Sequence, residues 1–264
     1  MNAIDAAFLR LRKAGEKGLV VYLTAGDPTP AASLSCFRAA ADAGADILEV
    51  GVPFSDPTAD GPTIEAASRR ALAGGMNVQR ALDLVRRFRK THDTPVVLFG
   101  YYNPFFRYGQ KALWRDARSA GVDGFLIVDL PYEEAVGAVS EMRVEGLAWI
   151  PLAAPTSGID RIRAFDRAGS GFLYLISVTG VTGARETLPP GMLSWTREVK
   201  SAVGLPLAVG FGISGPEMAR EASRHADAAV VGSACVKIVE RYGSSPRGPA
   251  ELSRFVRSLK SALR

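Results

Sequence analysis

The sequence is poor in the residues that build metal sites and disulfide frameworks. It contains two cysteines, Cys36 and Cys235, and two histidines, His92 and His225, in 264 residues. Neither cysteine has a CxxC neighbour, so neither a zinc site nor a disulfide framework is expected. Both thiols are predicted to behave as small buried hydrophobic groups.

Long uncharged apolar runs are also missing. No segment approaches the roughly 18 apolar residues that a membrane helix requires. The chain opens with MNAIDAAFLRLRKAGEKG, an amphipathic stretch with charges throughout, which lacks the apolar core of a signal peptide. We therefore expect a cytoplasmic protein.

The basic excess is not organised as a nucleic-acid site. The 32 basic and 27 acidic residues leave a net charge of +5. The basic residues are spread over helix-like segments such as 69–70 and 86–90 without interleaved aromatic residues, which indicates solvated helix faces. This positive charge is also suited to attracting a phosphorylated substrate over distance.

Short β-branched runs alternate with longer amphipathic stretches along the chain. Eight runs are predicted as strands: Leu19–Leu23, Ile47–Gly51, Val96–Phe99, Gly124–Val128, Trp149–Leu152, Phe172–Ile176, Pro206–Val209 and Ala228–Val231. The predicted helices include Ala31–Ala43, Val78–Arg89, Gln110–Ala120, Glu133–Val144, Ile159–Ala168, Leu193–Ala202, Pro216–Arg224, Ala234–Glu240 and Ala250–Leu263, with Gly243–Pro249 as a loop before the last one. This alternation predicts parallel strands joined by crossover helices.

The strand–helix units favour an α/β fold of the (β/α)₈ TIM-barrel type, formed as a single domain by residues 1–264. We expect an extra N-terminal helix and a short phosphate-binding helix after the eighth strand. A doubly wound open sheet is the structural alternative. The count of eight strands, the length and the absence of an opening GxGxxG turn favour the barrel. Catalytic residues are then expected where the strands end.

The second predicted strand carries an ionisable residue among apolar ones. Alternation places Ile47, Glu49 and Gly51 on one face of the strand, with Leu48 and Val50 on the other. Burial of a lone carboxylate is costly and raises its pKa, which makes Glu49 a candidate catalytic acid or base. A structural glutamate held by backbone amides or an arginine is the alternative interpretation.

The loop after this strand carries a second carboxyl group, that of Asp60, just before the next helix. Residues 52–62 contain three prolines, so the loop is stiff and suited to holding a side chain in place. Asp60 alone could be a helix N-cap. A rigid loop that joins two carboxyl groups at one barrel rim favours a catalytic pair.

Two glycine-rich loops are candidates for a phosphate site. The segment Gly210–Ser214, with Phe211 and Gly212, follows the seventh strand, while Gly232 and Ser233 follow the eighth and precede a short helix. Glycines let the backbone approach a phosphate closely, and a helix N-terminus offers free N–H groups. The alternative is that these glycines only mark turns.

A long run around these carboxyl groups resembles a known family. Residues 48–62, LEVGVPFSDPTADGP, closely resemble a motif of the tryptophan synthase α subunits. Further matches follow in order: LTAGDP at 23–28, YYNP at 101–104, DLP at 129–131, SVTGVTG at 177–183 and GFGIS at 210–214. The resemblance therefore covers the whole chain and implies a lyase of tryptophan biosynthesis that cleaves indole-3-glycerol phosphate to indole and glyceraldehyde 3-phosphate.

The resemblance also implies roles for individual residues. Glu49 would be the general acid and base of a retro-aldol cleavage, and Asp60 would bind the indole N–H. Tyr174 matches an active-site tyrosine expected to point toward Glu49. Thr182 would lie near Asp60 in a lid formed by residues 177–188, and Gly183 matches a position that contacts the phosphate.

Other reaction types lack the residues they need. A class I aldolase or a pyridoxal phosphate enzyme requires a lysine near the end of a strand, and the lysines lie before the first strand or in helix-like stretches. A zinc aldolase requires clustered histidines, which the two histidines of this chain do not form. Two readings stay open: a stand-alone lyase that releases free indole, and a catalytically idle activator of a β subunit, against which the intact Glu49 and Asp60 argue.

The family resemblance further implies a partner, the tryptophan synthase β subunit, in an α₂β₂ heterotetramer. No cofactor is expected in this chain, because pyridoxal phosphate belongs to the β partner. Aromatic loop residues are favoured at interfaces, although internal packing is the alternative here. The expected contacts are Asp56, Pro57, Asn103, Pro104, Phe105 and Phe106, within loops that include residues 103–108.

Two positions depart from the family pattern. Tyr22 stands where well-known relatives carry phenylalanine, and Gly100 stands where some carry a larger apolar residue that lines the indole pocket. These differences leave the acid–base residues intact and concern only the shape of the indole site.

Overall fold

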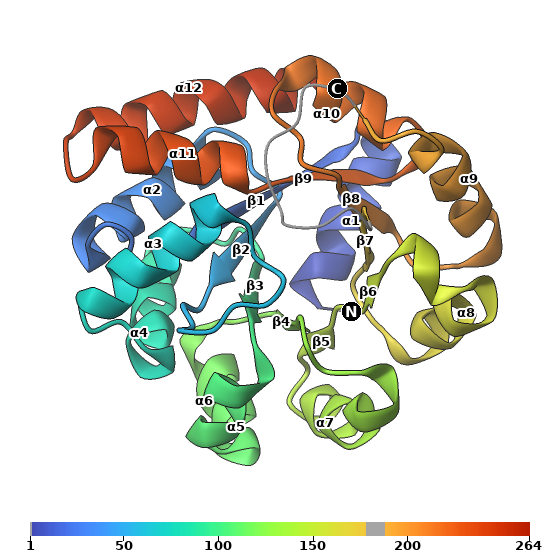
Figure 1. The fold of residues 1–264 in the computed structure, drawn as a ribbon, viewed down its shortest axis with the longest axis horizontal. Coiled ribbons are helices and arrows are strands. Elements are labelled where there is room, and N and C mark those ends of the chain that lie inside the picture. The colour runs from blue at the N-terminus through green and yellow to red at the C-terminus, as the bar shows by residue number, and fades with distance from the viewer. Residues whose placement is uncertain (1, 178–187) are drawn as a thin grey trace.

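The structure, a computed structural model, describes residues 2–177 and 188–264. Its parallel strands lie in the ring order β5-β4-β3-β2-β1-β9-β8-β7-β6, with helices arranged around them (Figure 1). The strands are β1 (Gly18–Thr24), β2 (Ile47–Gly51), β3 (Val96–Gly100), β4 (Gly124–Ile127), β5 (Ala148–Trp149), β6 (Leu152–Ala153), β7 (Leu173–Ile176), β8 (Leu207–Gly210) and β9 (Ala228–Val231). The predicted (β/α)₈ barrel is confirmed.

The prediction of one continuous fifth strand over residues 149–152 was wrong. In the structure this segment is divided between two short strands, β5 and β6. The N–H of Ile150 donates to the carbonyl of Phe125 on one side at 2.8 Å, and the carbonyl of Pro151 accepts from Tyr174 on the other at 2.9 Å. Pro151 has no N–H of its own, which interrupts the ladder where the chain changes neighbours. This short segment therefore contacts both β4 and β7 and closes the ring.

The helices form the outer layer. They are α1 (Ala3–Ala14), α2 (Pro30–Asp42), α3 (Pro62–Ala73), α4 (Val78–Arg89), α5 (Tyr102–Tyr108), α6 (Gln110–Ala120), α7 (Tyr132–Val144), α8 (Ile159–Ala168), α9 (Met192–Ala202), α10 (Pro216–Ala222), α11 (Ser233–Tyr242) and α12 (Arg247–Ala262), with short 3₁₀ turns at Pro155–Ser157 and Ser223–His225. Residues 103–108 were expected as a loop and lie in the helix α5 instead. The last helix begins at Arg247, inside the expected loop 243–249.

Two apolar layers hold the barrel together. Inward-facing side chains such as Val20, Ile47 and Val97 form one cluster inside the ring of strands. Outward-facing ones such as Leu48 and Val50 pack against the helices in a second, larger cluster. The alternation predicted for the second strand is thus confirmed.

Helix α1 closes the amino end of the barrel. Its buried face packs onto the cluster inside the ring of strands through Ile4, Phe8 and Leu11. Figure 1 shows α1 behind the strands at the centre of the ring. Asn2 caps this helix by accepting hydrogen bonds from the N–H groups of Ile4 and Asp5. The expected N-terminal helix is therefore present, and it leaves only the carboxyl end of the barrel open.

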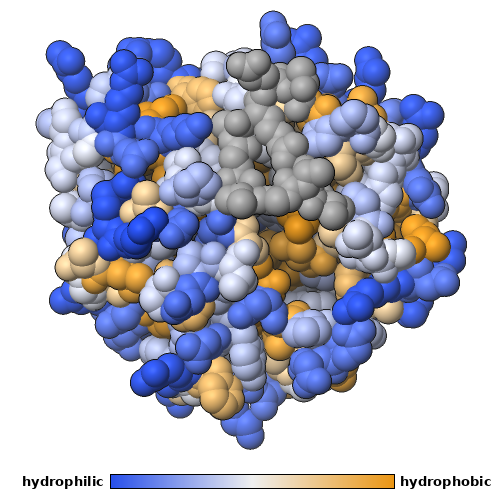
Figure 2. Space-filling model, in the orientation of Figure 1, coloured by the Kyte–Doolittle hydropathy of each residue, from blue (hydrophilic) through white to orange (hydrophobic). Residues whose placement is uncertain are grey.

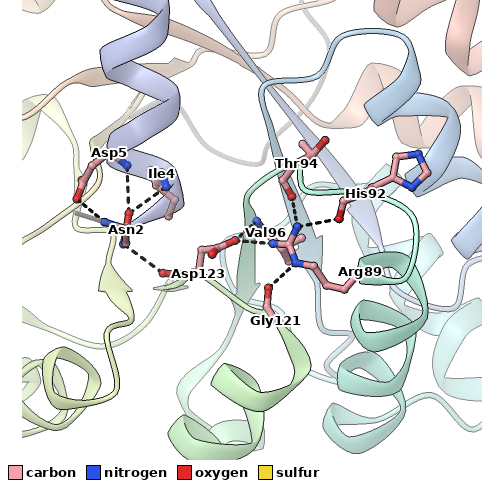
Figure 3. A network of polar contacts seen from close by, with 9 residues as sticks. All are labelled: Asn2, Ile4, Asp5, Arg89, His92, Thr94, Val96, Gly121 and Asp123. Carbon is pink, nitrogen blue, oxygen red and sulfur yellow. Dashed lines mark hydrogen bonds and ion pairs between the residues drawn. The ribbon is translucent and has the colours of Figure 1, made fainter.

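A polar network at the amino end fixes α4 to the strands (Figure 3). Arg89 donates to the carbonyls of Gly121 at 2.8 Å and Thr94 at 2.6 Å, and it pairs with Asp123. Asp123 in turn accepts from the N–H of Val96 at 2.9 Å. We call these contacts of Arg89 the amino-end network. They lie far from the carboxyl ends of the strands and serve the fold rather than a site.

No helix in the described residues is long and apolar enough to cross a membrane. The face at the carboxyl ends of the strands is largely hydrophilic at its edge, with hydrophobic residues gathered near its centre (Figure 2). This centre coincides with the open mouth of the barrel.

Candidate active site

A cavity of about 500 Å³ opens at the carboxyl end of the barrel. Its wall is mostly apolar and includes Phe99, Val128, Leu152 and Val230 from the strands. Glu49 and Asp60 line the same cavity, as expected from the sequence. The barrel thus brings together the two carboxyl groups of β2 and of the loop that follows it.

Glu49 is buried without any compensating group. Its side chain points from β2 into the cavity, the residue is 1% exposed, and neither carboxyl oxygen has a hydrogen-bond partner. Burial raises its pKa from an ordinary 4.5 to about 8. The alternative of a structural glutamate held by amides or an arginine is therefore excluded. A buried acid left unpaired in a cavity is available for proton transfer.

Asp60 is held from the loop between β2 and α3. Helix α3 is preceded by Gly61 as its N-cap, with no side-chain capping bond, so Asp60 is not a helix cap. Burial raises its pKa to about 6, while a hydrogen bond from Tyr101 opposes that rise. At neutral pH a larger fraction of Asp60 than of Glu49 is therefore ionised.

Tyr101 is a site residue that sequence reasoning missed. Its side chain is buried, its hydroxyl accepts a hydrogen bond from the N–H of Ala59 at 3.1 Å, and it is hydrogen-bonded to Asp60. Phe54 packs on its ring at 5.4 Å between centroids. Its position directly after β3, at the carboxyl rim where catalytic residues gather, could have identified Tyr101 from the sequence.

Two tyrosines, Tyr22 and Tyr174, form parts of the cavity wall, and each requires a glycine on the neighbouring strand. A Cβ atom at Gly51 would lie 2.2 Å from the Tyr22 hydroxyl, and one at Gly210 would lie 2.4 Å from the Tyr174 hydroxyl. Tyr22 also meets Phe99 edge to face at 5.1 Å. Tyr174 lines the same cavity as Glu49. Burial raises the pKa of both hydroxyls, so they stay protonated.

Gly100 does not line this cavity. A Cβ atom added at Gly100 would lie 2.8 Å from the ring of Phe105. Gly100 therefore faces the outer helices, and the neighbouring Phe99 faces the cavity instead. The expectation that residue 100 shapes the indole site was wrong for this chain, because strand alternation turns it outward.

The glycine-rich loops contribute a further part of the cavity wall. Gly212 and Ile213 follow β8, and Gly232 and Ser233 stand at the beginning of α11; all four line the cavity. Gly212 has φ +77°, a conformation that favours glycine. Phe211 is fully buried in the outer cluster, so only its backbone faces this region.

Two of the predicted substrate-binding residues cannot be placed. Thr182 and Gly183 lie outside the described residues, as does most of the expected lid 177–188. Ser177, at the end of the described segment, lines the cavity.

Two of the residues expected at a partner interface, Asn103 and Pro104, line a second hollow of about 450 Å³. Asp56 is exposed, and Phe106 is 59% exposed. Phe105, in contrast, is 0% exposed and packs on Phe125 at 5.5 Å. Phe105 has no surface to offer a partner here, because the helix α5 turns it inward.

The described residues contain no cluster of three or more histidine, cysteine, aspartate or glutamate side chains that could hold a metal ion. The barrel, its apolar cavity and the unpaired buried acid are features of the (β/α)₈ class of enzymes, and such an acid can serve general acid–base chemistry.

Comparison with known proteins gives the family. The family model described as tryptophan synthase alpha chain matches residues 8–264. The tryptophan synthase alpha chain of Citrifermentans bemidjiense is 48% identical over 263 residues, covering 100% of this chain and 98% of the relative. That of Geobacter sulfurreducens is 46% identical, covering 100% and 99%. This chain belongs to the tryptophan synthase alpha chain family.

Solved structures agree. The tryptophan synthase subunit alpha of Legionella pneumophila superposes with a TM-score of 0.92 at 38% identity, covering 100% of this chain and 98% of that one. A structure of the tryptophan synthase α₂β₂ complex from Pyrococcus furiosus matches with a TM-score of 0.86 at 37% identity, covering 93% and 99%. The chain is thus a lyase of tryptophan biosynthesis, the enzyme of the α reaction.

Proposed function

We propose that this chain cleaves indole-3-glycerol phosphate with Glu49 and Asp60 as its two working carboxyl groups. The observation that carries the proposal is the unpaired, buried Glu49 in the same cavity as Asp60. A buried polar group without a partner costs stability, and such strain is characteristic of functional sites.

Glu49 would transfer protons in both directions. With a pKa of about 8 it is largely protonated at neutral pH and can donate its proton to C3 of the indole ring. The resulting carboxylate can then accept the proton of the adjacent glycerol hydroxyl. As that O–H bond breaks, a carbonyl forms, the carbon–carbon bond breaks, and its electron pair returns to the ring. Indole and glyceraldehyde 3-phosphate result, and Glu49 is protonated again.

Asp60 would stabilise the charged intermediate. Protonation at C3 places positive charge on the ring nitrogen, and a carboxylate beside that N–H lowers the energy of this state. With a pKa of about 6, Asp60 is mostly ionised at neutral pH. The hydrogen bond from Tyr101 favours this form and orients it. The different environments of the two carboxyl groups thus separate their roles, one as the acid and the other as the fixed anion.

The phosphate would bind at Gly212, Gly232 and Ser233. The first N–H groups of α11 have no partner within the helix, and the positive end of the helix dipole favours an anion. Asp60 and these three residues line one cavity, which suits a substrate with indole at one end and phosphate at the other. Gly183 is included in the proposal on the family resemblance alone.

We further infer that residues 1–264 form a single domain that acts in the cytoplasm as the α subunit of an α₂β₂ heterotetramer. The complex from Pyrococcus furiosus supports the assembly. Asp56, Pro57, Asn103, Pro104 and Phe106 remain the proposed contacts with the β subunit. No cofactor is assigned to this chain, and pyridoxal phosphate would be held by the β partner.

The test compares release of glyceraldehyde 3-phosphate by the native chain, Glu49→Gln and Asp60→Asn, alone and with a β subunit. We expect each variant to lose about 10²–10⁴-fold in kcat, the range typical of a proton-transfer or electrostatic group. Asp83→Asn, which changes an exposed carboxyl of α4, is the control and should keep native activity. Native-like turnover by either site variant would refute its assigned role.

A further inference from the structure

One ion-pair cluster beside the cavity takes no part in the chemistry above. Arg70 donates from Nε and Nη2 to the two carboxyl oxygens of Asp27 at 2.7 and 3.0 Å, and from Nη1 to Oε1 of Glu240 at 2.8 Å. The Asp27 side chain is 2% exposed, and a buried carboxylate requires paired donors of this kind. We call these three residues the Arg70 clamp. None of them lines the cavity.

The Arg70 clamp joins three separate elements. Asp27 lies in the loop after β1, Arg70 lies in the last turn of α3, and Glu240 lies near the end of α11. Helices α3 and α11 also pack on each other, and Figure 1 shows them side by side. Because the guanidinium is planar and bidentate, it holds these elements in one relative orientation.

A small apolar cluster ties the same two helices to the cavity wall. Ile64 and Ala67 of α3 and Val236 of α11 pack together on Tyr22. The helices are therefore connected twice, by apolar packing near their beginnings and by the Arg70 clamp near their ends. A rigid pair of helices results, fixed above β1.

Each of these helices begins beside residues that line the cavity. Helix α3 begins at Pro62, directly after Asp60 and Gly61, whereas α11 begins at Ser233. The relative position of the two helices therefore determines the separation between Asp60 and the glycine-rich phosphate loop.

We propose that Arg70 is a positioning residue that sets the spacing between the indole end and the phosphate end of the site. This inference rests on the proposed function. Because indole and phosphate belong to one substrate molecule, both ends bind together only if the spacing matches the chain between them. Looser spacing weakens the binding of a linked ligand, whereas the separate indole and phosphate halves still bind at their own ends of the site.

The experiment uses calorimetry with three ligands: indole, glycerol 3-phosphate, and a non-cleavable compound in which an unbranched propyl chain joins indole to phosphate. In Arg70→Met we expect the affinity for the linked compound to fall at least about tenfold, since linking two halves strengthens binding by about 10²–10⁴-fold only where the linker spans both sites. The affinities for the two separate halves should change less than about twofold. Glu240→Gln, which weakens only the α11 contact, should lie between Arg70→Met and the native chain.

Arg89→Met is the matched structural control. Arg89 is also a half-buried, multiply bonded arginine (Figure 3), but no residue of its amino-end network lines the cavity. This variant should lose stability and keep the native ratio between linked and separate ligands. Equal loss of that ratio in Arg70→Met and Arg89→Met, or no loss in Arg70→Met, would overturn the inference. A native chain that binds the linked compound no better than its halves would instead refute the proposed function and the inference with it.

Discussion

Glu49 and Asp60 illustrate how the environment of a single residue decides its chemistry. Both are carboxylic acids in one cavity, yet Glu49 has no partner while Asp60 is hydrogen-bonded to Tyr101. Their pKa values are about 8 and about 6. This difference follows from hydrogen bonding and depth of burial rather than from residue type.

The raised pKa of Glu49 has a consequence for stability. The folded state holds its proton up to about pH 8, whereas the unfolded chain loses it near 4.5. Between these values the folded state binds more protons, so stability falls as pH rises, by about 1.4 kcal/mol per pH unit. Glu49→Gln cannot ionise and lacks this slope. Urea unfolding at pH 5.5 and 7.5 should therefore show the variant gaining up to about 3 kcal/mol relative to the native chain. A constant difference at both pH values would contradict the burial of an unpaired acid.

At the scale of elements, α1 acts as a lid on the amino end of the barrel. Its apolar face completes the inner cluster, and the Asn2 cap fixes where the helix begins. Phe8 of this face contacts Phe172 at 5.7 Å. The helix contributes nothing to the cavity at the opposite end, so its role is to stabilise the strands that carry the site.

Adjacent residues of α1 offer a test of this role. Phe8→Ala removes a buried ring from the inner cluster and should lower the free energy of unfolding by about 3–5 kcal/mol. Leu9 is 41% exposed, so Leu9→Ala on the same helix should cost less than about 1 kcal/mol. Chemical denaturation of both variants measures the difference. Similar losses in both would mean that α1 does not seal the barrel.

At the scale of the whole molecule, the barrel separates stability from function along its axis. The amino end carries α1 and the amino-end network, while the carboxyl end carries the cavity and the second hollow. The proposed partner surface therefore adjoins the active site. This arrangement lets binding of a β subunit influence the loops around the cavity.

Phe106 tests that surface. Its ring is 59% exposed and lies on α5 beside the second hollow, and exposed aromatic residues are common interface hot spots. Phe106→Ala should weaken assembly with the β subunit by about 1–2 kcal/mol, measured by sedimentation velocity. Val144→Ala changes a residue that is 86% exposed at the end of α7, away from the cavity, and should assemble normally. Unchanged assembly of Phe106→Ala would show that α5 is not part of the interface.

Much of the fold was predictable because its signals are local. The helices Val78–Arg89, Gln110–Ala120 and Ile159–Ala168 have their predicted bounds, since each is an amphipathic stretch with clear ends. Residues 103–108 were mistaken for a loop because Pro104 and several aromatic side chains obscure a short helix. The division of the fifth strand could not be predicted, because it depends on where the chain exchanges β4 for β7 as its neighbour.

The sequence by itself determined the barrel and singled out Glu49, because strand alternation and a lone acid in an apolar run are properties of adjacent residues. Only the tertiary structure decided that Tyr101 holds Asp60, that Gly100 and Phe105 face away from the cavity, and that Arg70 links α3 to α11. These facts depend on contacts between segments distant in the chain, and such contacts exist only once the ring of strands has closed.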